Sequence, residues 1–177
     1  MNRRETMSDD PGPDDIVLVD TNVFVAVGDP ENAKYQSLRE YAIRRDLTLS
    51  VPRRVKRELS AMHIADRVES AVDDGWADVV APPSPTDSAA VAAMDSVRRE
   101  IARRSPKDEH EVEKADTVLA GLAIEYLKCR EDQVFVLTDD TVAAKAITGA
   151  VKRQGFEDEV TVLTRDDILD GDDLRII

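Results

Sequence analysis

The chain contains few cysteine, histidine and aromatic residues, and each shortage excludes or disfavours a class of protein. Its single cysteine, Cys129, rules out an intramolecular disulfide framework. It lies near a predicted helix end, and a buried structural thiol is the default expectation for it. Two histidines, His63 and His110, exclude a histidine-rich metal site and disfavour catalysis by a serine–histidine or cysteine–histidine pair. Aromatic residues make up only 4%, so the core must be built mainly from aliphatic side chains.

Long apolar runs and glycine-rich nucleotide motifs are also absent from the sequence. No run approaches the roughly 20 consecutive apolar residues that span a membrane, and the N-terminus lacks the apolar core of a signal peptide. Neither a Walker lysine motif nor a GxGxxG run is present, which disfavours enzymes with nucleotide cofactors. We therefore expect a cytoplasmic protein without a membrane partner.

Positive charge is scarce relative to negative charge. Lysine and arginine total 24 against 37 aspartate and glutamate residues, which gives a formal net charge of -13 and a pI of about 4.6. Asp outnumbers Glu and Arg outnumbers Lys, a composition typical of halophiles that accumulate salt. Such charge keeps a protein soluble where salt screens the repulsion. We assign most acids to this adaptation, so the low pI does not by itself exclude a nucleic-acid partner.

The pattern of apolar residues predicts one α/β domain. Residues 1–15, rich in Asp, Pro and Gly, predict a disordered acidic tail, and residues 16–177 a single domain. Apolar runs and helical periodicity predict strands at 16–19, 47–51, 77–80, 134–137 and 160–163, a helix or turn at 21–27, and helices at 33–45, 53–70, 88–104, 112–128 and 141–154. This alternation indicates a three-layer α/β/α sandwich around a parallel sheet of about five strands.

Four acidic residues lie at the ends of these predicted elements, namely Asp20, Glu58, Asp116 and Asp140. Because the carboxyl ends of parallel strands are where α/β sheets place their ligands, we expect these carboxylates to gather at one edge. Gathered carboxylates repel each other unless a cation or protons intervene. Hard oxygen ligands in that number suit Mg²⁺ or Mn²⁺. The pattern predicts a metal-dependent phosphodiesterase, and most simply a ribonuclease.

Four short motifs carry these acids in a fixed order. They read VDTN at 19–22, VPRRVKREL at 51–59, ADTVLAGLA at 115–123 and VLTDD at 136–140. In this order, and on these predicted elements, they resemble the PIN-domain nucleases, a family that includes toxin ribonucleases and RNA-processing endonucleases. The resemblance covers nearly the whole chain from Ile16 onward. The segment after the fourth motif is longer than in compact toxin members, which favours an RNA-processing or uncharacterised branch.

The resemblance implies a carboxylate pocket that holds Mg²⁺ or Mn²⁺. In it Asp20 is the central ligand, Asp116 and Asp140 complete the pocket, and Glu58 is a further ligand or holds the attacking water. Metal ions lower the pKa of bound water, and this water attacks the phosphorus in line and leaves a 5′-phosphate. Glu58 as a solvated helix acid, and Asp116 as an acid that only stabilises a helix N-terminus, remain the alternatives.

The resemblance also implies residues around these ligands. Asn22 and Thr138 would orient the carboxylates. Asp139 competes with Asp140 for the fourth position: the Thr-x-Asp spacing favours Asp140, and Asp139 could share the metal. Glu113, one helical turn before Asp116, is a weaker candidate for an extra ligand.

Two groups of basic residues are conspicuous in so acidic a chain. The candidates for contacts with RNA phosphates are Arg53, Arg54, Lys56 and Arg57 before Glu58, and Arg98 and Arg99 together with Arg103 and Arg104 before the third motif. The alternative is that they pair with acids of the same helix. Few aromatic residues are available to stack on bases, so we expect RNA shape to dominate recognition. The family resemblance leaves open an antitoxin protein and a homodimer as partners.

Three other classes of function compete with the ribonuclease. A catalytically silent PIN-like scaffold that binds RNA or protein would have the fold without metal binding. A flap-type DNA nuclease carries more acids and a helical arch, for which this chain has little room. A phosphoacceptor receiver module needs an acid after its third strand, where this sequence has Val79-Val80-Ala81-Pro82.

Overall fold

The structure is a computed structural model that describes residues 9–80, 86–104, 114–129 and 133–168, without the side chains of residues 114–116. Its core is a five-stranded, wholly parallel sheet in the order β3-β2-β1-β4-β5. The strands are β1 (Ile16–Val19), β2 (Leu49–Pro52), β3 (Ala77–Val80), β4 (Val134–Leu137) and β5 (Val160–Leu163). The predicted parallel sheet is therefore confirmed.

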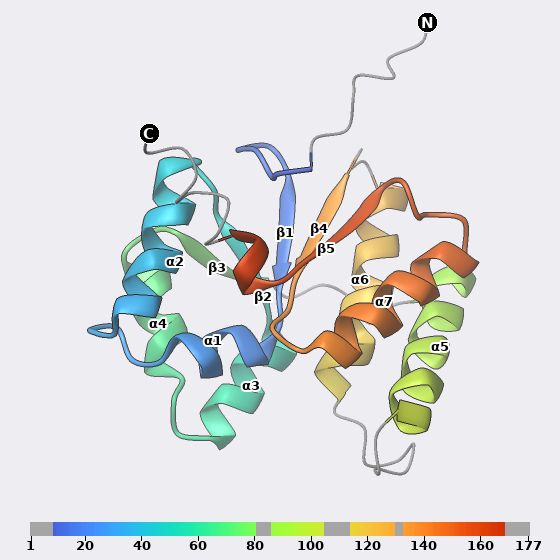
Figure 1. The fold of residues 1–177 in the computed structure, drawn as a ribbon, viewed down its shortest axis with the longest axis horizontal. Helices are drawn as coiled ribbons and strands as arrows, with labels where there is room; N and C mark the ends of the chain where they lie inside the picture. The colour runs from blue at the N-terminus through green and yellow to red at the C-terminus, as the bar shows by residue number, and fades with distance from the viewer. Residues whose placement is uncertain (1–8, 81–85, 105–113, 130–132, 169–177) are drawn as a thin grey trace, which may run out of the picture.

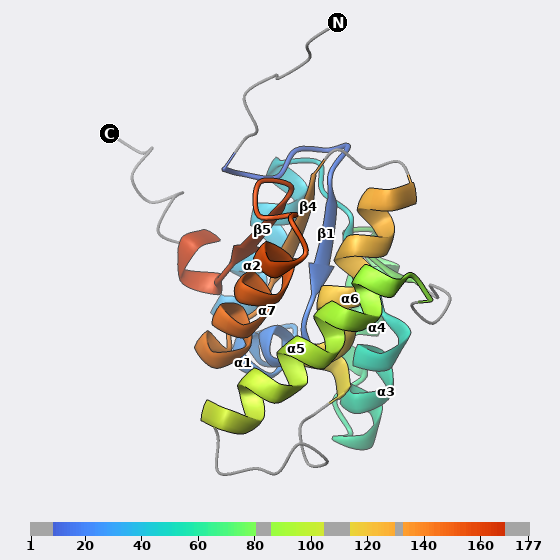
Figure 2. The same cartoon turned by 90° about the vertical axis from the view of Figure 1, so that its right-hand side faces the viewer.

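Helices cover both faces of the sheet (Figure 1). One face carries α1 (Thr21–Val27), α2 (Ala33–Arg44), α3 (Arg53–Ala61) and α4 (Asp66–Asp73); the other carries α5 (Ser88–Arg104), α6 (Lys114–Cys129) and α7 (Thr141–Arg153). Side chains alternate between the faces along a strand. Val17 and Val19 accordingly pack with the first group of helices, and Leu18 packs with the second. The three-layer α/β/α sandwich predicted from the sequence is confirmed, and Figure 2 shows the second layer from its outer side.

The region predicted as one helix at 53–70 is two helices, and that prediction was wrong. Helix α3 ends just before His63, which adopts a positive φ of 61°, and the Ile64 N–H donates to the Leu59 carbonyl at 2.9 Å. This is a helix C-terminus with a left-handed residue where glycine is usual, so the sequence gives little warning of it. Met62, which would face the core if the helix continued with the same apolar period, is 50% exposed because of the break.

Three further observations concern the chain ends and the cysteine. Residues 9–15 of the predicted tail are described: Pro11 is buried and Asp10 pairs with Arg45 at 3.4 Å. After β5 the chain forms a helical turn at 165–168, and Ile168 is buried in the core. Cys129 is exposed because it lies in the last turn of α6 beyond the core, so the expectation of a buried thiol was wrong.

Within the described residues, no helix is long and apolar enough to cross a membrane.

Candidate functional site

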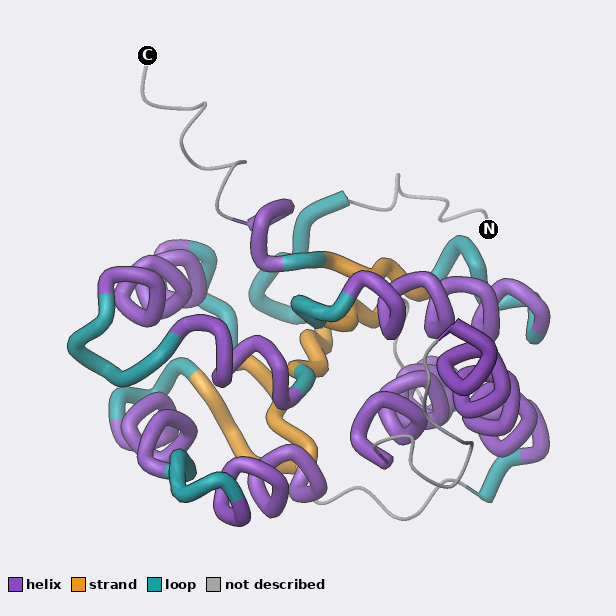
Figure 3. The backbone as a smooth tube through the Cα atoms, turned by 60° about the horizontal axis from the view of Figure 1, so that its bottom comes forward, coloured by secondary structure: helices purple, strands orange, loops and turns teal. Residues whose placement is uncertain are grey.

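The order of the strands creates a crevice between β1 and β4. From β1 the chain proceeds to β2 and β3 on one side, whereas β4 lies on the other side of β1 and leads outward to β5. At such a switch point the connections leave adjacent strands toward opposite faces, and a crevice opens beyond the carboxyl ends of the strands. Figure 3, in which the lower end of Figure 1 comes forward, shows this edge of the sheet. Two of the predicted acids, Asp20 and Asp140, follow the two strands that flank the switch point.

Asp20 is a fully buried carboxylate at the end of the central strand. It is 0% exposed and forms the N-cap of α1. Its Oδ1 accepts a hydrogen bond from the Thr21 N–H at 2.7 Å, and its Oδ2 accepts one from the Thr138 hydroxyl at 2.8 Å. Burial of an ionised carboxylate is costly without such donors. The structure thus holds a carboxyl group at the base of the crevice with its two oxygens fixed in direction.

Glu58 is joined to Asp20 through Thr21. The Thr21 Oγ1 donates to Glu58 Oε2 at 2.7 Å, while the Thr21 backbone N–H donates to Asp20. Glu58 Oε1 also forms a salt bridge with the Nε of Arg54, one helical turn earlier, at 3.3 Å. Sequence reasoning gave Thr21 no role of its own. The available signal was its position directly after Asp20, at the first residue of α1.

Asp140 is connected to the same network from the opposite side of the crevice. Its backbone N–H donates to the Thr138 Oγ1 at 3.2 Å, so one hydroxyl contacts both Asp140 and Asp20. Its Oδ1 caps α7 by accepting from the Val142 and Ala143 N–H groups at 2.8 and 3.1 Å. The two threonines therefore link the three described acids Asp20, Glu58 and Asp140.

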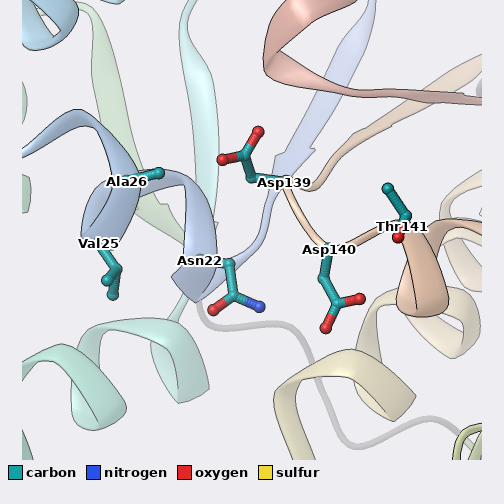
Figure 4. Close-up of a pocket in the computed structure, with 6 residues that line it drawn as sticks. All are labelled: Asn22, Val25, Ala26, Asp139, Asp140 and Thr141. Atoms are coloured by element: carbon teal, nitrogen blue, oxygen red, sulfur yellow. The ribbon is translucent and has the colours of Figure 1, made fainter.

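Asp139 and Asp140 point in different directions (Figure 4). The Asp140 carboxylate lies on the side to which the Asn22 amide points, and the Asp139 carboxylate points away from both. Asp139 instead pairs with Arg165, whose Nη2 lies 3.6 Å from its Oδ2 and whose Nη1 donates to the Ala26 carbonyl at 3.4 Å. Of the two neighbouring acids, the geometry places Asp140 with the other site residues.

An open depression of about 410 Å³ lies above this network. It is lined by Asn22, Val25, Ala26, Asp139, Asp140 and Thr141. Thr138 contacts Asp20 as the expected orienting role requires. For Asn22, by contrast, no hydrogen bond to a carboxylate is found among the described residues, and its amide faces the depression (Figure 4).

The comparison with known families agrees with this architecture. Residues 13–175 match the model of the halobacterial PIN domain. The chain belongs to the PIN-domain family. Neither the curated proteins nor the solved structures contain a match. PIN domains are generally nucleases and typically use Mg²⁺ or Mn²⁺, so this chain has a nuclease-type fold.

For Asp116, the third predicted acid of this PIN domain, the structure describes the backbone alone. Asp116 is in the first turn of α6, and its side chain, like the whole of Glu113, lies outside the described residues. Helix α6 packs against α3 and β4. Its first turn stands at the same end of the sheet as α3 (Figure 1). The backbone therefore brings Asp116 to the correct edge.

The chemistry of the donors suits a hard divalent cation. Asp20, Glu58 and Asp140 offer carboxylate oxygens, and each carboxylate has about four acceptor sites, so a hydrogen bond does not prevent metal ligation. Within the described part of the chain, however, no three Asp, Glu, His or Cys side chains are grouped closely enough to hold a metal. A ligand set would therefore need the Asp116 side chain or a rearrangement of Glu58 away from Arg54.

The predicted basic residues divide into paired and unpaired ones. Among those on α5, Arg98 pairs with Asp95 at 3.3 Å, and Arg99 donates to the Asp95 carbonyl. Farther along, Arg103 and Arg104 pair with Glu100, and the hydrogen bond from Arg104 holds the pKa of that carboxyl below its usual range. On α3, Arg54 pairs with Glu58 and Lys56 with Glu69. Arg53 and Arg57 are exposed, and no described acid forms an ion pair with either.

Proposed function

We propose that this PIN domain is an endoribonuclease that depends on Mg²⁺ or Mn²⁺ and hydrolyses RNA phosphodiester bonds. The observation that carries the proposal is the fully buried Asp20 carboxylate at the switch point, joined by Thr21 to Glu58 and by Thr138 to Asp140. Burial of a carboxyl group at a ligand-binding edge costs more free energy than an acid on the surface, which favours a functional role.

The residues have distinct roles in the proposed reaction. Asp20, Asp140 and Asp116 would hold the cation, and Thr21 and Thr138 fix the directions of the Asp20 oxygens. Glu58 would orient the attacking water and take its proton. A divalent cation supplies Lewis acidity, which lowers the pKa of water and offsets charge on the phosphoryl oxygens. The water oxygen would bond to phosphorus as the bond to the 3′-oxygen breaks, leaving a 5′-phosphate, and the 3′-oxygen would take its proton from solvent water.

The test is cleavage of structured and single-stranded RNA, and of the matching DNA, at high salt with Mn²⁺, Mg²⁺ or chelator. Wild type would be compared with Asp20→Asn, which keeps the side-chain shape and leaves Thr138 able to rotate its hydroxyl. We expect RNA cleavage that requires metal. In Asp20→Asn it should fall by more than the roughly 10–100-fold typical of residues that only support ligands.

One observation supports a second candidate, a catalytically silent scaffold that binds RNA or protein. The described carboxylates are held by donors of their own chain, and they do not form a three-acid group. Calorimetric titration with Mn²⁺ separates the two candidates. Binding that Asp20→Asn abolishes supports the nuclease, whereas absence of both binding and cleavage supports the scaffold. Cleavage of DNA alone would favour the flap-type DNA nuclease instead.

A further inference from the structure

Arg53, Arg57 and Lys145 are exposed, and no described acid forms an ion pair with them. Within the described residues they share this property with Lys34, Arg99 and Arg153. Elsewhere ion pairs are common, for example Arg39 with Asp74 at 3.1 Å and Lys152 with Glu157 at 3.3 Å. In a chain with 37 acidic residues, exposed cations without partners are informative.

The sequence explains why these three cations have no partner on their own helices. Side chains three or four residues apart are neighbours on a helix surface. None of the positions three or four residues from Arg53, Arg57 or Lys145 holds Asp or Glu. Arg98 and Arg104, by contrast, have Asp95 and Glu100 at that spacing and pair with them.

The fold brings these cations to two sides of the candidate site. Arg53 and Arg57 lie one turn apart on α3, and Arg57 directly precedes Glu58. Lys145 lies on α7 one turn after Thr141, the helix residue that lines the depression. Helix α1 packs against α3. The same end of the sheet holds α1, α3 and the start of α7 in two perpendicular views (Figures 1 and 2).

We infer that Arg53 and Arg57 on one side, and Lys145 on the other, bind RNA phosphates that flank the scissile bond. This inference rests on the proposed nuclease function and adds the path of the substrate. Two arginines at i and i+4 present their guanidinium groups along one direction, as neighbouring phosphates of one strand require. Between the two sides lie the acids at the switch point, so the bond to be cut would lie over Asp20 and Asp140.

The inference predicts a specific change in the salt dependence of RNA binding. Each phosphate contact on a single strand contributes about 0.7 to the slope of log K against log salt. The triple variant Arg53→Ala, Arg57→Ala, Lys145→Ala should therefore lower the magnitude of the slope by about 2. Binding of a labelled single-stranded RNA would be measured by fluorescence anisotropy across a salt series, in an Asp20→Asn background that prevents cleavage.

A matched control keeps the net charge equal. Arg39, Arg44 and Lys152 are also two arginines and one lysine, exposed or half-exposed, and they lie on α2 and α7 farther from the candidate site. The triple variant Arg39→Ala, Arg44→Ala, Lys152→Ala should keep the slope of the parent. An equal loss in both triple variants, or an unchanged slope in the first, would overturn the proposed path.

Cleavage separates failure of this path from failure of the nuclease proposal. With Asp20 intact, the first triple variant should show a raised KM and a nearly unchanged kcat. If RNA binding changes as expected while wild type cleaves nothing, the phosphate contacts of the three cations stand and the nuclease proposal fails. If wild type cleaves RNA and the slope stays unchanged, the nuclease proposal stands and the path fails.

Discussion

Asp20 shows at the scale of one residue how local structure and the candidate chemistry coincide. The same carboxylate caps α1 and accepts the Thr138 hydroxyl from the end of the neighbouring strand. A cap needs only one oxygen, so the second oxygen can accept a hydrogen bond from a residue 118 positions away in sequence. The burial of this carboxyl group is tolerated because each of its oxygens has a fixed donor.

Arg165 decides, at the same scale, how the two neighbouring acids after β4 differ. Its guanidinium lies between Asp139 and the Ala26 carbonyl, and its Nε is buried with no hydrogen-bond partner among the described residues. The ion pair ties Asp139 to Arg165, whereas Asp140 forms no ion pair with a described cation, although both acids line the depression. The VLTDD motif alone left this choice open, because Arg165 comes from a distant segment beyond β5.

Arg165→Met should therefore strengthen the binding of Mn²⁺. The substitution removes the ion-pair partner of Asp139, so that the Asp139 carboxylate becomes available to the metal in addition to Asp140. We expect a lower Kd for Mn²⁺ by calorimetry or electron paramagnetic resonance, together with a loss of about 1–3 kcal/mol in the free energy of unfolding. Adding Asp139→Asn should return the Kd to that of wild type. An unchanged Kd in Arg165→Met, or no reversal in the double variant, would show that Asp139 has no such latent role.

Continuous apolar runs explain most of what was predictable at the scale of secondary-structure elements, whereas one helix end was missed. The strands at 16–19, 77–80, 134–137 and 160–163 were predicted with the bounds of β1, β3, β4 and β5, because buried parallel strands read as continuous apolar runs. The break between α3 and α4 was missed. His63 ends α3 in a left-handed conformation, and the apolar period continues through Met62 as if the helix did too.

Asp140 caps α7 and is also a proposed metal ligand, and substitutions can separate these two roles. Asn caps a helix about as well as Asp, whereas Ala does not cap it. We expect Asp140→Asn to keep the stability of wild type but to lose metal-dependent cleavage. Asp140→Ala should lose cleavage and, in addition, about 0.5–2 kcal/mol of unfolding free energy, measured by chemical denaturation. Equal stability of the two variants would mean that the contacts with Val142 and Ala143 contribute little.

Charge is the property that matters most at the scale of the whole molecule. A net charge of -13 on 177 residues produces self-repulsion, and the ion pairs along the helices offset only part of it. The same charge repels RNA in general, so any phosphate contact must be local. The exposed Arg53, Arg57 and Lys145 satisfy this condition at the carboxyl edge of the sheet, while the arginines of α5 are engaged with acids of their own helix.

The free energy of unfolding should therefore rise as salt increases. Between about 0.1 M and 1 M the Debye length falls from about 10 Å to about 3 Å, which screens most repulsion between exposed acids. Denaturation by urea in a KCl series would measure the effect. A neutral osmolyte at matched osmolarity serves as the control for solvent exclusion. Stability that is flat or falls with KCl would contradict the assignment of the acids to adaptation to salt.

The alternation of strands and helices, the four acid-bearing motifs and the shortage of basic residues follow from the amino-acid sequence alone. These are local properties, since apolar period, capping residues and charge are read within a few positions. The three-dimensional arrangement was needed to show that β1 and β4 are neighbours, that Thr21 and Thr138 join the acids, and that Arg165 pairs with Asp139. Those contacts join residues tens of positions apart, and their partners are fixed by strand order rather than by any pattern along the chain.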